Sequence, residues 1–193
     1  FLQTDYVGYL SKAFELSRTF EQRWSVNWQF IPHHLFIGRT FATGLLCLHS
    51  ALLLLFAQKR WCRQNQGLLR LLTGGRNNIS SGNRSRYPFD VNHVLDTVFT
   101  CNFIGVACSR TLHYQFYTWY YHALPFLLWR TNLPSVARLF LFIGIETGFN
   151  VFPASAVSSA LLQSCHAVLL VAIWLAPLQP SMDVEKSAKV KEI

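Results

Sequence analysis

The stretch LFIGRTFATGLLCLHSALLLLFA, residues 35–57, is apolar along almost its whole length. Its one charged residue, Arg39, lies near the start, and the basic pair Lys59 and Arg60 follows its end. A helix needs about 20 predominantly apolar residues to cross a bilayer. Residues 35–57 therefore predict a transmembrane helix.

The composition of the whole chain also favours a membrane protein over a soluble domain. Of 193 residues, 51% are hydrophobic and 13% are charged, whereas soluble domains average about 25% charged residues. The 16 Phe, 7 Tyr and 6 Trp residues gather beside apolar runs, as aromatic side chains do at membrane interfaces. The net charge of +8 comes from one loop and the tail rather than from a basic stripe on a folded face. We therefore expect membrane lipid and no nucleic acid as a partner.

Further apolar runs follow the first one. Residues 91–109 form a weaker candidate span that carries Asp96, and residues 114–129 form a shorter one that contains Pro125. These two runs are either spans or a re-entrant pair, and either arrangement returns the chain to the same side of the membrane. The remaining apolar runs are residues 133–152 and 157–176. The sequence thus predicts an all-α polytopic membrane protein.

The orientation in the membrane follows from the loop at residues 58–90. Its basic residues are Lys59, Arg60, Arg63, Arg70, Arg76, Arg84 and Arg86. No acidic residue precedes Asp90 in this loop, so the positive-inside rule predicts that it is cytosolic. Counting crossings then places residues 1–34 and the neighbourhood of Arg110 on the luminal side and residues 177–193 in the cytosol.

The C-terminal tail carries a pattern that agrees with this orientation. Lys189 and Lys191 are fifth and third from the end, which matches the dilysine signal that cytosolic coat proteins read to return membrane proteins to the endoplasmic reticulum. The alternative is an ordinary solvated, lysine-rich end. The glycosylation sequons at Asn78 and Asn83 lie in the cytosolic loop, and we expect them to carry no glycan.

The residues before the first span predict an amphipathic helix. Residues 9–30 alternate apolar and charged turns and end with Trp24 and Trp28, which suits a helix along the luminal interface. Packing against another part of a larger protein is the alternative. The chain begins with Phe1 and its one methionine is Met182, so we expect it to be a fragment that lacks its N-terminal part.

Ionisable residues within predicted spans are functional candidates, because charge is costly in hydrocarbon. They are Arg39, Asp96, Arg138 and Glu146. Arg39 and Arg138 lie near span ends and can extend to the interface. Glu146 lies beyond the middle of its span, and we expect it to face the bundle interior, paired or protonated, in either a structural or a functional role. His49 and His166 favour contacts between helices.

Polar and aromatic residues are unusually dense between Cys101 and Trp129. Arg110, His113 and Tyr117 have the spacing i, i+3 and i+7, so a helix would present them on one face. A guanidinium, an imidazole and aromatic rings together suit a phosphate with an apolar tail. An aromatic belt with contacts inside the bundle is the alternative. The histidines and acids lack the spacing of metal ligands, so we expect no metal and no cofactor.

Three sequence strings resemble one known family. They are RTFEQRWSVNWQFI at residues 18–31, CNFIGVACSRTLHYQFYTWYYHALPFLLW at residues 101–129, and CHAV at residues 165–168. They resemble the α-1,3-mannosyltransferases of the endoplasmic reticulum that elongate the dolichol-linked oligosaccharide. The resemblance implies the C-terminal part of a multi-span GT-C-type glycosyltransferase of the endoplasmic reticulum membrane.

The implied reaction transfers mannose from dolichyl phosphate mannose to the five-mannose, dolichol-linked acceptor in protein N-glycosylation. The family's catalytic base is expected on an upstream luminal loop, so we expect this chain alone to be inactive. Arg110 and His113 are then candidates for binding the departing dolichyl phosphate. The candidates for the lipid or sugar pocket are Tyr114, Gln115, Tyr117 and Trp119. The candidates for a luminal platform near the acceptor glycan are Trp24, Asn27 and Trp28.

Two other classes of protein remain compatible with the residues. A transporter would use Glu146 and Asp96 for coupling, although no inverted repeat supports this interpretation. A scaffold protein of the endoplasmic reticulum would have the same membrane spans but would catalyse no reaction.

Overall fold

The computed structural model describes residues 4–13, 21–63, 67–74 and 91–177, and these form helices and their connections without a strand. The longer elements are α3 (Arg39–Phe56), which continues as the π-helix η2 (Ala57–Trp61), α5 (Val91–Cys108), α7 (Ser135–Asn150) and α8 (Ala156–Leu175). The shorter ones are α1 (Tyr6–Ala13), η1 (Gln22–Trp24), α2 (His33–Phe36), α4 (Leu68–Gly74), η4 (Tyr114–Trp119), η5 (Tyr121–Ala123) and α6 (Leu124–Trp129). The prediction of an all-α protein is confirmed.

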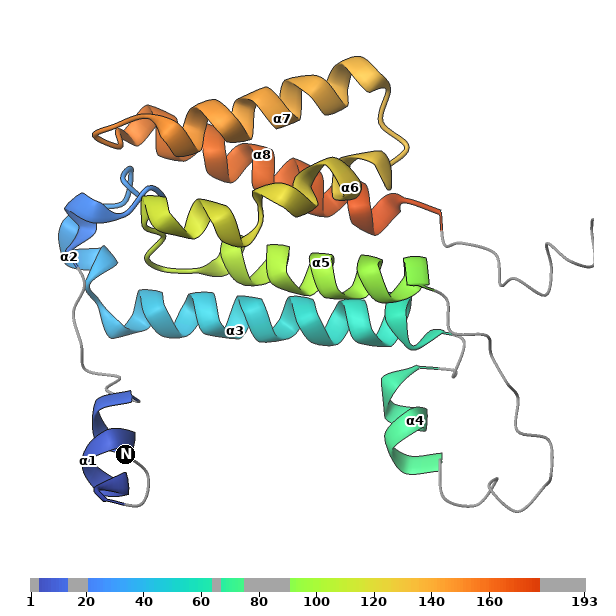
Figure 1. Cartoon of the computed structure of the whole chain (residues 1–193), viewed down its shortest axis with the longest axis horizontal. Helices are drawn as coiled ribbons and strands as arrows, with labels where there is room; N and C mark the ends of the chain where they lie inside the picture. The colour runs from blue at the N-terminus through green and yellow to red at the C-terminus, as the bar shows by residue number, and fades with distance from the viewer. Residues whose placement is uncertain (1–3, 14–20, 64–66, 75–90, 178–193) are drawn as a thin grey trace, which may run out of the picture.

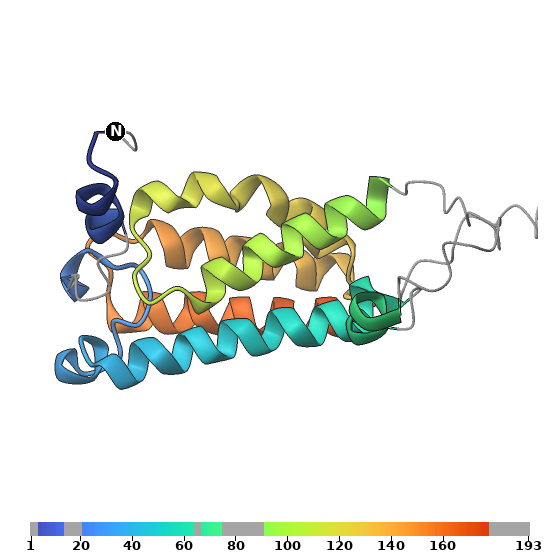
Figure 2. The same ribbon diagram turned by 90° about the horizontal axis from the view of Figure 1, so that it is seen from below.

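The long helices lie side by side and reverse direction at each connection (Figures 1 and 2). One end of the bundle, the Ser109 end, gathers residues 22–38, 109–116 and 151–155 (Figure 1). The opposite end, the Arg60 end, gathers residues 57–63, 67–74 and 130–134 and the last turn of α8 (Figure 1). Segments that the sequence predicts on one side of the membrane therefore share one end of the bundle, and the assignment of the ends to lumen and cytosol remains a prediction.

Among the described residues, three helices are long and apolar enough to cross a membrane: Arg39–Trp61, Val91–Cys108 and Ala156–Leu175. The first begins four residues later than predicted, because Gly38 separates it from the short α2. Residues 114–129 do not form one helix: two 3-10 turns precede the short α6. This segment nevertheless returns along the bundle toward the Arg60 end (Figure 1).

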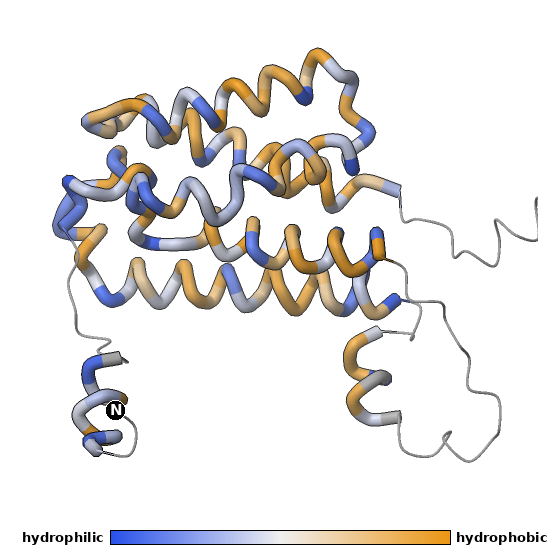
Figure 3. The backbone as a smooth tube through the Cα atoms, viewed as in Figure 1, coloured by the Kyte–Doolittle hydropathy of each residue, from blue (hydrophilic) through white to orange (hydrophobic). Residues whose placement is uncertain are grey.

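The interior is apolar and so is much of the outer surface. Fully buried side chains from α5 to α8 form the core: Phe103, Ile104, Leu124, Leu127, Ile145, Leu162 and Leu169. Large apolar side chains also point outward along the helices, among them Leu46, Leu54, Phe140 and Val157. Figure 3 shows hydrophobic residues along the whole length of the long helices. A surface of this kind matches a lipid environment rather than water.

The tight hairpin of α7 and α8 depends on a small residue. A Cβ atom at Gly148 would lie 3.0 Å from the Ser158 carbonyl oxygen and 3.1 Å from the Leu162 Cβ. Membrane helices associate closely where small residues let backbones approach. At the start of α8, Ser155 accepts a hydrogen bond from the Ser158 backbone N–H in a capping box, which fixes where the hairpin turns.

The predicted amphipathic helix over residues 9–30 is wrong for its second half. η1 ends at Trp24, and residues 25–30 form an irregular, partly extended segment. Trp28 has a φ of 61°, which lies in the left-handed region that non-glycine residues rarely adopt. Residues 14–20 lie outside the described residues, as do the sequons at Asn78 and Asn83 and the dilysine pattern at Lys189 and Lys191.

Candidate functional site

Two segments that the sequence singled out separately contact each other at the Ser109 end. The Val26 backbone N–H donates a 2.7 Å hydrogen bond to the Leu112 carbonyl oxygen. The Leu112 backbone N–H in turn donates to the Ser25 hydroxyl oxygen at 3.1 Å. Ser25, Val26 and Asn27 are fully buried in this contact. Residues 25–27 therefore form part of the interior rather than an exposed edge.

The side chains of this segment converge on one backbone oxygen. The Asn27 Nδ2 donates to the Ser109 carbonyl oxygen at 2.6 Å, and the Trp28 indole Nε1 donates to the same oxygen at 2.8 Å. The Ser25 hydroxyl donates to the Asn27 Oδ1 at 2.6 Å and so orients the amide. We call Ser25, Asn27, Trp28 and Ser109 the Ser109 latch. The strained backbone of Trp28 persists because the surrounding contacts fix it.

Arg110 and His113 follow the latch directly in the chain. The His113 Nδ1 lies 2.9 Å from the Trp24 carbonyl oxygen, and its ring packs edge-on against Phe116 at 5.6 Å. Arg110 is half-buried in the short connection after α5. The predicted helical face of Arg110, His113 and Tyr117 is wrong, because the backbone at His113 is extended and η4 is a 3-10 helix. In a continuing helix the Ser109 carbonyl oxygen would accept a backbone hydrogen bond. Here it accepts a side-chain hydrogen bond from Asn27 of the latch instead.

An open pocket of about 550 Å³ lies between α3, α5 and the segment after α5. It is lined by His49, Cys101, Asn102, Gly105, Val106, Ser109, Thr111, Leu112, Phe116 and Trp119. We call it the α3–α5 pocket. The rings of Phe116 and Trp119 stack at 4.3 Å, and the Asn102 Nδ2 donates to the Trp119 carbonyl oxygen at 2.8 Å. A few polar groups in a mainly apolar wall are typical of a site for a small polar group with an apolar tail.

The structure separates the residues that the sequence grouped as pocket candidates. Trp119 lines the α3–α5 pocket. Tyr114 and Tyr117 turn toward α7 instead: the Tyr114 hydroxyl donates to the Val151 carbonyl oxygen at 2.7 Å, and the Tyr117 hydroxyl contacts the Glu146 carboxylate. Gln115 is exposed and does not line the pocket. Of the four candidates for a lipid or sugar pocket, Tyr114, Gln115 and Tyr117 therefore lie outside the α3–α5 pocket.

The predicted luminal platform is also revised. Trp24 is 48% exposed and remains available at the surface. Asn27 is 0% exposed, and its amide is engaged by Ser109, so it cannot contact a glycan. Trp28 is half-buried, with its indole N–H engaged by the same carbonyl.

Sequence reasoning did not assign His49, Asn102 and Thr111 to a pocket. The available signal was the seven-residue spacing of Asn102 and Ser109, which puts two polar residues on one face of an apolar helix. His49 faces the same pocket from α3.

Ionisable residues inside the bundle have partners. The Asn150 Nδ2 donates to the Glu146 Oε2 at 3.4 Å, so Glu146 is paired by Asn150 and Tyr117, as predicted. The Tyr120 hydroxyl lies 3.1 Å from the Nε2 of buried His166, which confirms a contact between packed segments. Within the described residues there is no group of three His, Cys, Asp or Glu side chains that could hold a metal ion.

Comparison with known proteins identifies the family. The model of the family described as "ALG3 protein" matches residues 1–159. The chain belongs to the ALG3 family. The match covers the Ser109 latch, the α3–α5 pocket and Glu146 with its partners Tyr117 and Asn150. It ends at the beginning of α8.

Relatives of this ALG3-family chain come from distant organisms. It is 44% identical to the human protein named Dol-P-Man:Man(5)GlcNAc(2)-PP-Dol alpha-1,3-mannosyltransferase, over 98% of this chain and 43% of the human one. Proteins of the same name are 41% identical in Arabidopsis thaliana, over 92% of this chain and 42% of the relative, and 34% identical in Neurospora crassa, over 95% and 43%. The chain thus spans less than half the length of these relatives. No solved structure matches it.

Proposed function

We propose that this chain forms the donor-binding part of a mannosyltransferase that uses dolichyl phosphate mannose. The observation that carries the proposal is the Ser109 latch, which fixes the chain immediately before Arg110, and the neighbouring residues Ser109, Thr111 and Leu112 line the α3–α5 pocket at one end of the bundle. His113 is held in the same segment by its contact with the Trp24 carbonyl oxygen. The named relatives support the same substrates, because their names specify dolichyl phosphate mannose as donor and the five-mannose dolichol-linked oligosaccharide as acceptor.

In this proposal the acceptor hydroxyl attacks C1 of the β-linked mannose. The bond between C1 and the phosphate oxygen breaks, dolichyl phosphate leaves with the electron pair, and inversion produces the α-1,3 linkage. Negative charge grows on the departing phosphate, and Arg110 offers a fork of donors that suits phosphate oxygens. His113 is the second candidate donor, and because its Nδ1 faces the Trp24 carbonyl oxygen, its ring must be protonated for Nε2 to donate to the phosphate. Donors fixed before the reaction stabilise developing charge without reorganising.

The pocket then holds the sugar and the first part of the lipid. The Trp119 ring offers an apolar face to the sugar ring, and the Asn102 and Thr111 side chains offer polar groups to its hydroxyls. The residues lining the pocket include no carboxylate. We therefore assign the base that accepts the proton of the acceptor hydroxyl to the part of the family's length that this chain does not span.

We further propose that the Ser109 end faces the lumen of the endoplasmic reticulum. The basic residues Lys59, Arg60 and Arg63 at the opposite end support this orientation through the positive-inside rule. The tail with Lys189 and Lys191 then lies in the cytosol, where coat proteins read dilysine signals. No observation favours a transporter, since Glu146 is engaged by Tyr117 and Asn150.

The test uses the full-length enzyme that contains this segment, supplied with dolichyl phosphate mannose and the five-mannose acceptor. Arg110→Ala and His113→Ala are each expected to lower kcat/KM for formation of the six-mannose product by about 100-fold, the usual effect of removing one charge-stabilising donor. Arg39→Ala is the matched control, because Arg39 is an exposed arginine at the same end of the bundle. Wild-type turnover by both folded variants would refute the proposal.

A further inference from the structure

A second, smaller cavity lies at the Arg60 end, between α3 and α8. Its volume is about 160 Å³, and its lining is entirely apolar: Leu52, Leu55, Phe56, Leu170, Val171 and Trp174. We call it the α3–α8 groove. It shares no residue with the α3–α5 pocket and belongs to the opposite end of the bundle.

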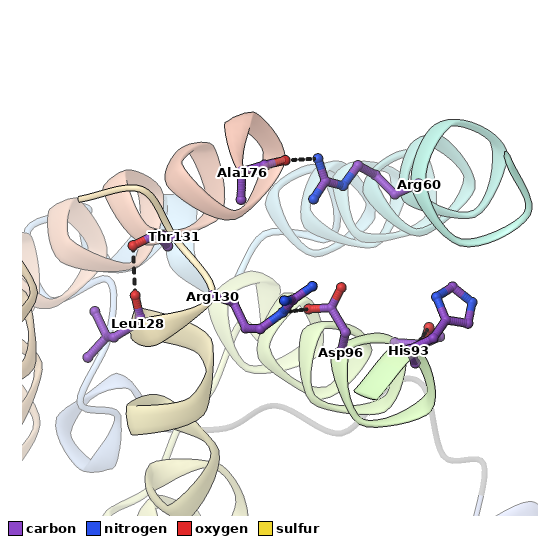
Figure 4. Close-up of polar contacts among 8 residues, drawn as sticks. Arg60, His93, Asp96, Leu128, Arg130, Thr131 and Ala176 are labelled. Atoms are coloured by element: carbon purple, nitrogen blue, oxygen red, sulfur yellow. Dashed lines mark hydrogen bonds and ion pairs between the residues drawn. The ribbon is translucent and has the colours of Figure 1, made fainter. Parts of the chain in front are cut away.

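Arg60 lies at the end of this groove and bridges its two walls. It is one helical turn beyond Phe56, and its Nη1 donates to the Trp174 carbonyl oxygen at 2.8 Å. The same Nη1 donates to the Ala176 carbonyl oxygen at 2.6 Å (Figure 4). These carbonyls belong to the last turn of α8, where a cation is favourable. A guanidinium has five N–H donors, and Nη1 supplies two of them. Nε and Nη2 make no hydrogen bond to the residues that the structure describes, so a fork of donors remains.

The charges around Arg60 favour an anion. Arg63, Arg130 and Asp96 are close enough to interact with it electrostatically. The Asp96 carboxylate is itself paired with the Arg130 Nε at 3.4 Å (Figure 4). Lys59 adds a further positive charge on the same turn of η2. Among the described residues around Arg60 the balance of charge is therefore positive, and the acid among them, Asp96, already has a partner.

Aromatic residues place the groove just below the membrane interface. The Phe56 ring packs edge-on against Trp174 at 5.0 Å and lies tilted against Trp61 at 5.6 Å. Tryptophan is enriched at the headgroup level of membrane helices. We therefore expect Arg60 to lie at headgroup depth, with the groove extending from it into the hydrocarbon.

We propose that Arg60 and the α3–α8 groove form a binding site for an anionic phospholipid of the adjacent leaflet. The phosphate accepts hydrogen bonds from Nε and Nη2 of Arg60, and one acyl chain fills the groove. An apolar cavity of about 150 Å³ accepts a benzene-sized group, so the groove fits a segment of acyl chain and is too small for a helix about 10 Å wide. Basic pockets between membrane helices on the cytoplasmic side are known to bind anionic headgroups.

The experiment measures lipid binding by the full-length protein in nanodiscs of phosphatidylcholine with increasing phosphatidylserine. A ligand that binds only the folded state raises the midpoint of thermal unfolding with its concentration. We expect such a rise, and we expect a phosphatidylserine with a photoreactive acyl chain to label peptides that contain Leu55 or Val171.

Two variants separate the site from general effects of the bilayer. Val171→Trp fills the groove and leaves the Arg60 contacts with α8 intact, and it is expected to weaken phosphatidylserine binding by about tenfold, or about 1.4 kcal/mol. Arg60→Gln is expected to remove the preference for phosphatidylserine, whereas Arg60→Lys, which keeps the charge, retains part of it. Leu46→Trp, on an exposed position of α3 outside the groove, is the control.

Three results would overturn the proposal. One is an equal unfolding midpoint in phosphatidylcholine and phosphatidylserine. Another is equal loss of binding in Leu46→Trp and Val171→Trp. The third is a complete lack of labelling by the photoreactive lipid on peptides that contain Leu55 or Val171, which would mean that protein covers the groove. The readout is binding and not sugar transfer, so it does not depend on the proposed function.

Discussion

The side-chain amide of Asn27 donates a 2.6 Å hydrogen bond to the carbonyl oxygen of Ser109, which is 82 positions later in the chain. The indole of Trp28 donates to the same oxygen, so both lone pairs of that carbonyl are used. The connection from α5 to η4 is thereby fixed at its first residue, immediately before Arg110. Any role of Arg110 in binding an anion depends on this geometry.

The latch predicts that Asn27 acts through Arg110. In the full-length enzyme, Asn27→Ala removes one of the two donors to the Ser109 carbonyl and also the acceptor of the buried Ser25 hydroxyl, which should cost about 1–3 kcal/mol of stability. Its effect on kcat/KM should shrink in an Arg110→Ala background, because the loop then has no guanidinium to position. Kinetics of the wild type, both single variants and the double variant measure this coupling. Additive effects of the two substitutions would contradict a positioning role.

The pocket predicts a specific effect of Trp119. Trp119→Ala removes the stacked partner of Phe116 and part of the pocket wall. We expect the KM for dolichyl phosphate mannose to rise by about tenfold, equivalent to about 1.4 kcal/mol. Trp129→Ala, an exposed tryptophan at the Arg60 end, provides the comparison. An unchanged KM in Trp119→Ala, measured by donor titration, would exclude the α3–α5 pocket as the donor site.

The contact between the Tyr117 hydroxyl and the Glu146 carboxylate predicts that substitutions of these two residues have coupled effects on stability. Tyr117→Phe and Glu146→Gln each weaken the contact between η4 and α7, and side-chain hydrogen bonds inside membrane bundles contribute about 0.6 kcal/mol on average. The double variant should lose less than the sum of the two single losses. Unfolding in a detergent titration measures the three free energies. A fully additive double variant would mean that the phenol and the carboxylate do not interact.

Gly148 predicts a steric requirement in the hairpin of α7 and α8. Gly148→Ala places a methyl group 3.0 Å from the Ser158 carbonyl oxygen, and overpacking of this kind costs about 1–3 kcal/mol. Gly44→Ala is a matched control, because no atom lies within 4 Å of its added Cβ. Thermal unfolding in detergent compares the two variants, and equal midpoints would show that the hairpin has room to adjust.

The proposed orientation predicts which positions face the cytosol. In a background without the 5 native cysteines, a membrane-impermeant maleimide should label Arg63→Cys in sealed microsomes. It should label Gln115→Cys, an exposed position at the Ser109 end, only after the membrane is permeabilised. The opposite pattern, or a glycan on Asn78 or Asn83, would invert the topology and remove the luminal donor site.

Much of the architecture was predictable from local sequence. The boundaries of Val91–Cys108 and Ala156–Leu175 lie within one residue of the predicted runs at 91–109 and 157–176. Predominantly apolar runs determine such helices, because in hydrocarbon every backbone N–H and C=O must be satisfied within the helix. The same argument predicted that Glu146 would have a partner, since an isolated charge there is too costly.

The arrangement of the site was decided only by tertiary structure. The sequence identified Arg110, His113, Tyr117, Asn27 and Trp28 as unusual, but helical spacing assigned three of them to one face that does not exist. Helical periodicity describes neighbours within a few turns, whereas the carbonyl of Ser109 is held by side chains from a distant segment. The sequence by itself determined which segments cross the bundle and what chemistry they carry. Contacts between segments decided which way each side chain points, because a buried carbonyl takes whichever donors the packed fold brings to it.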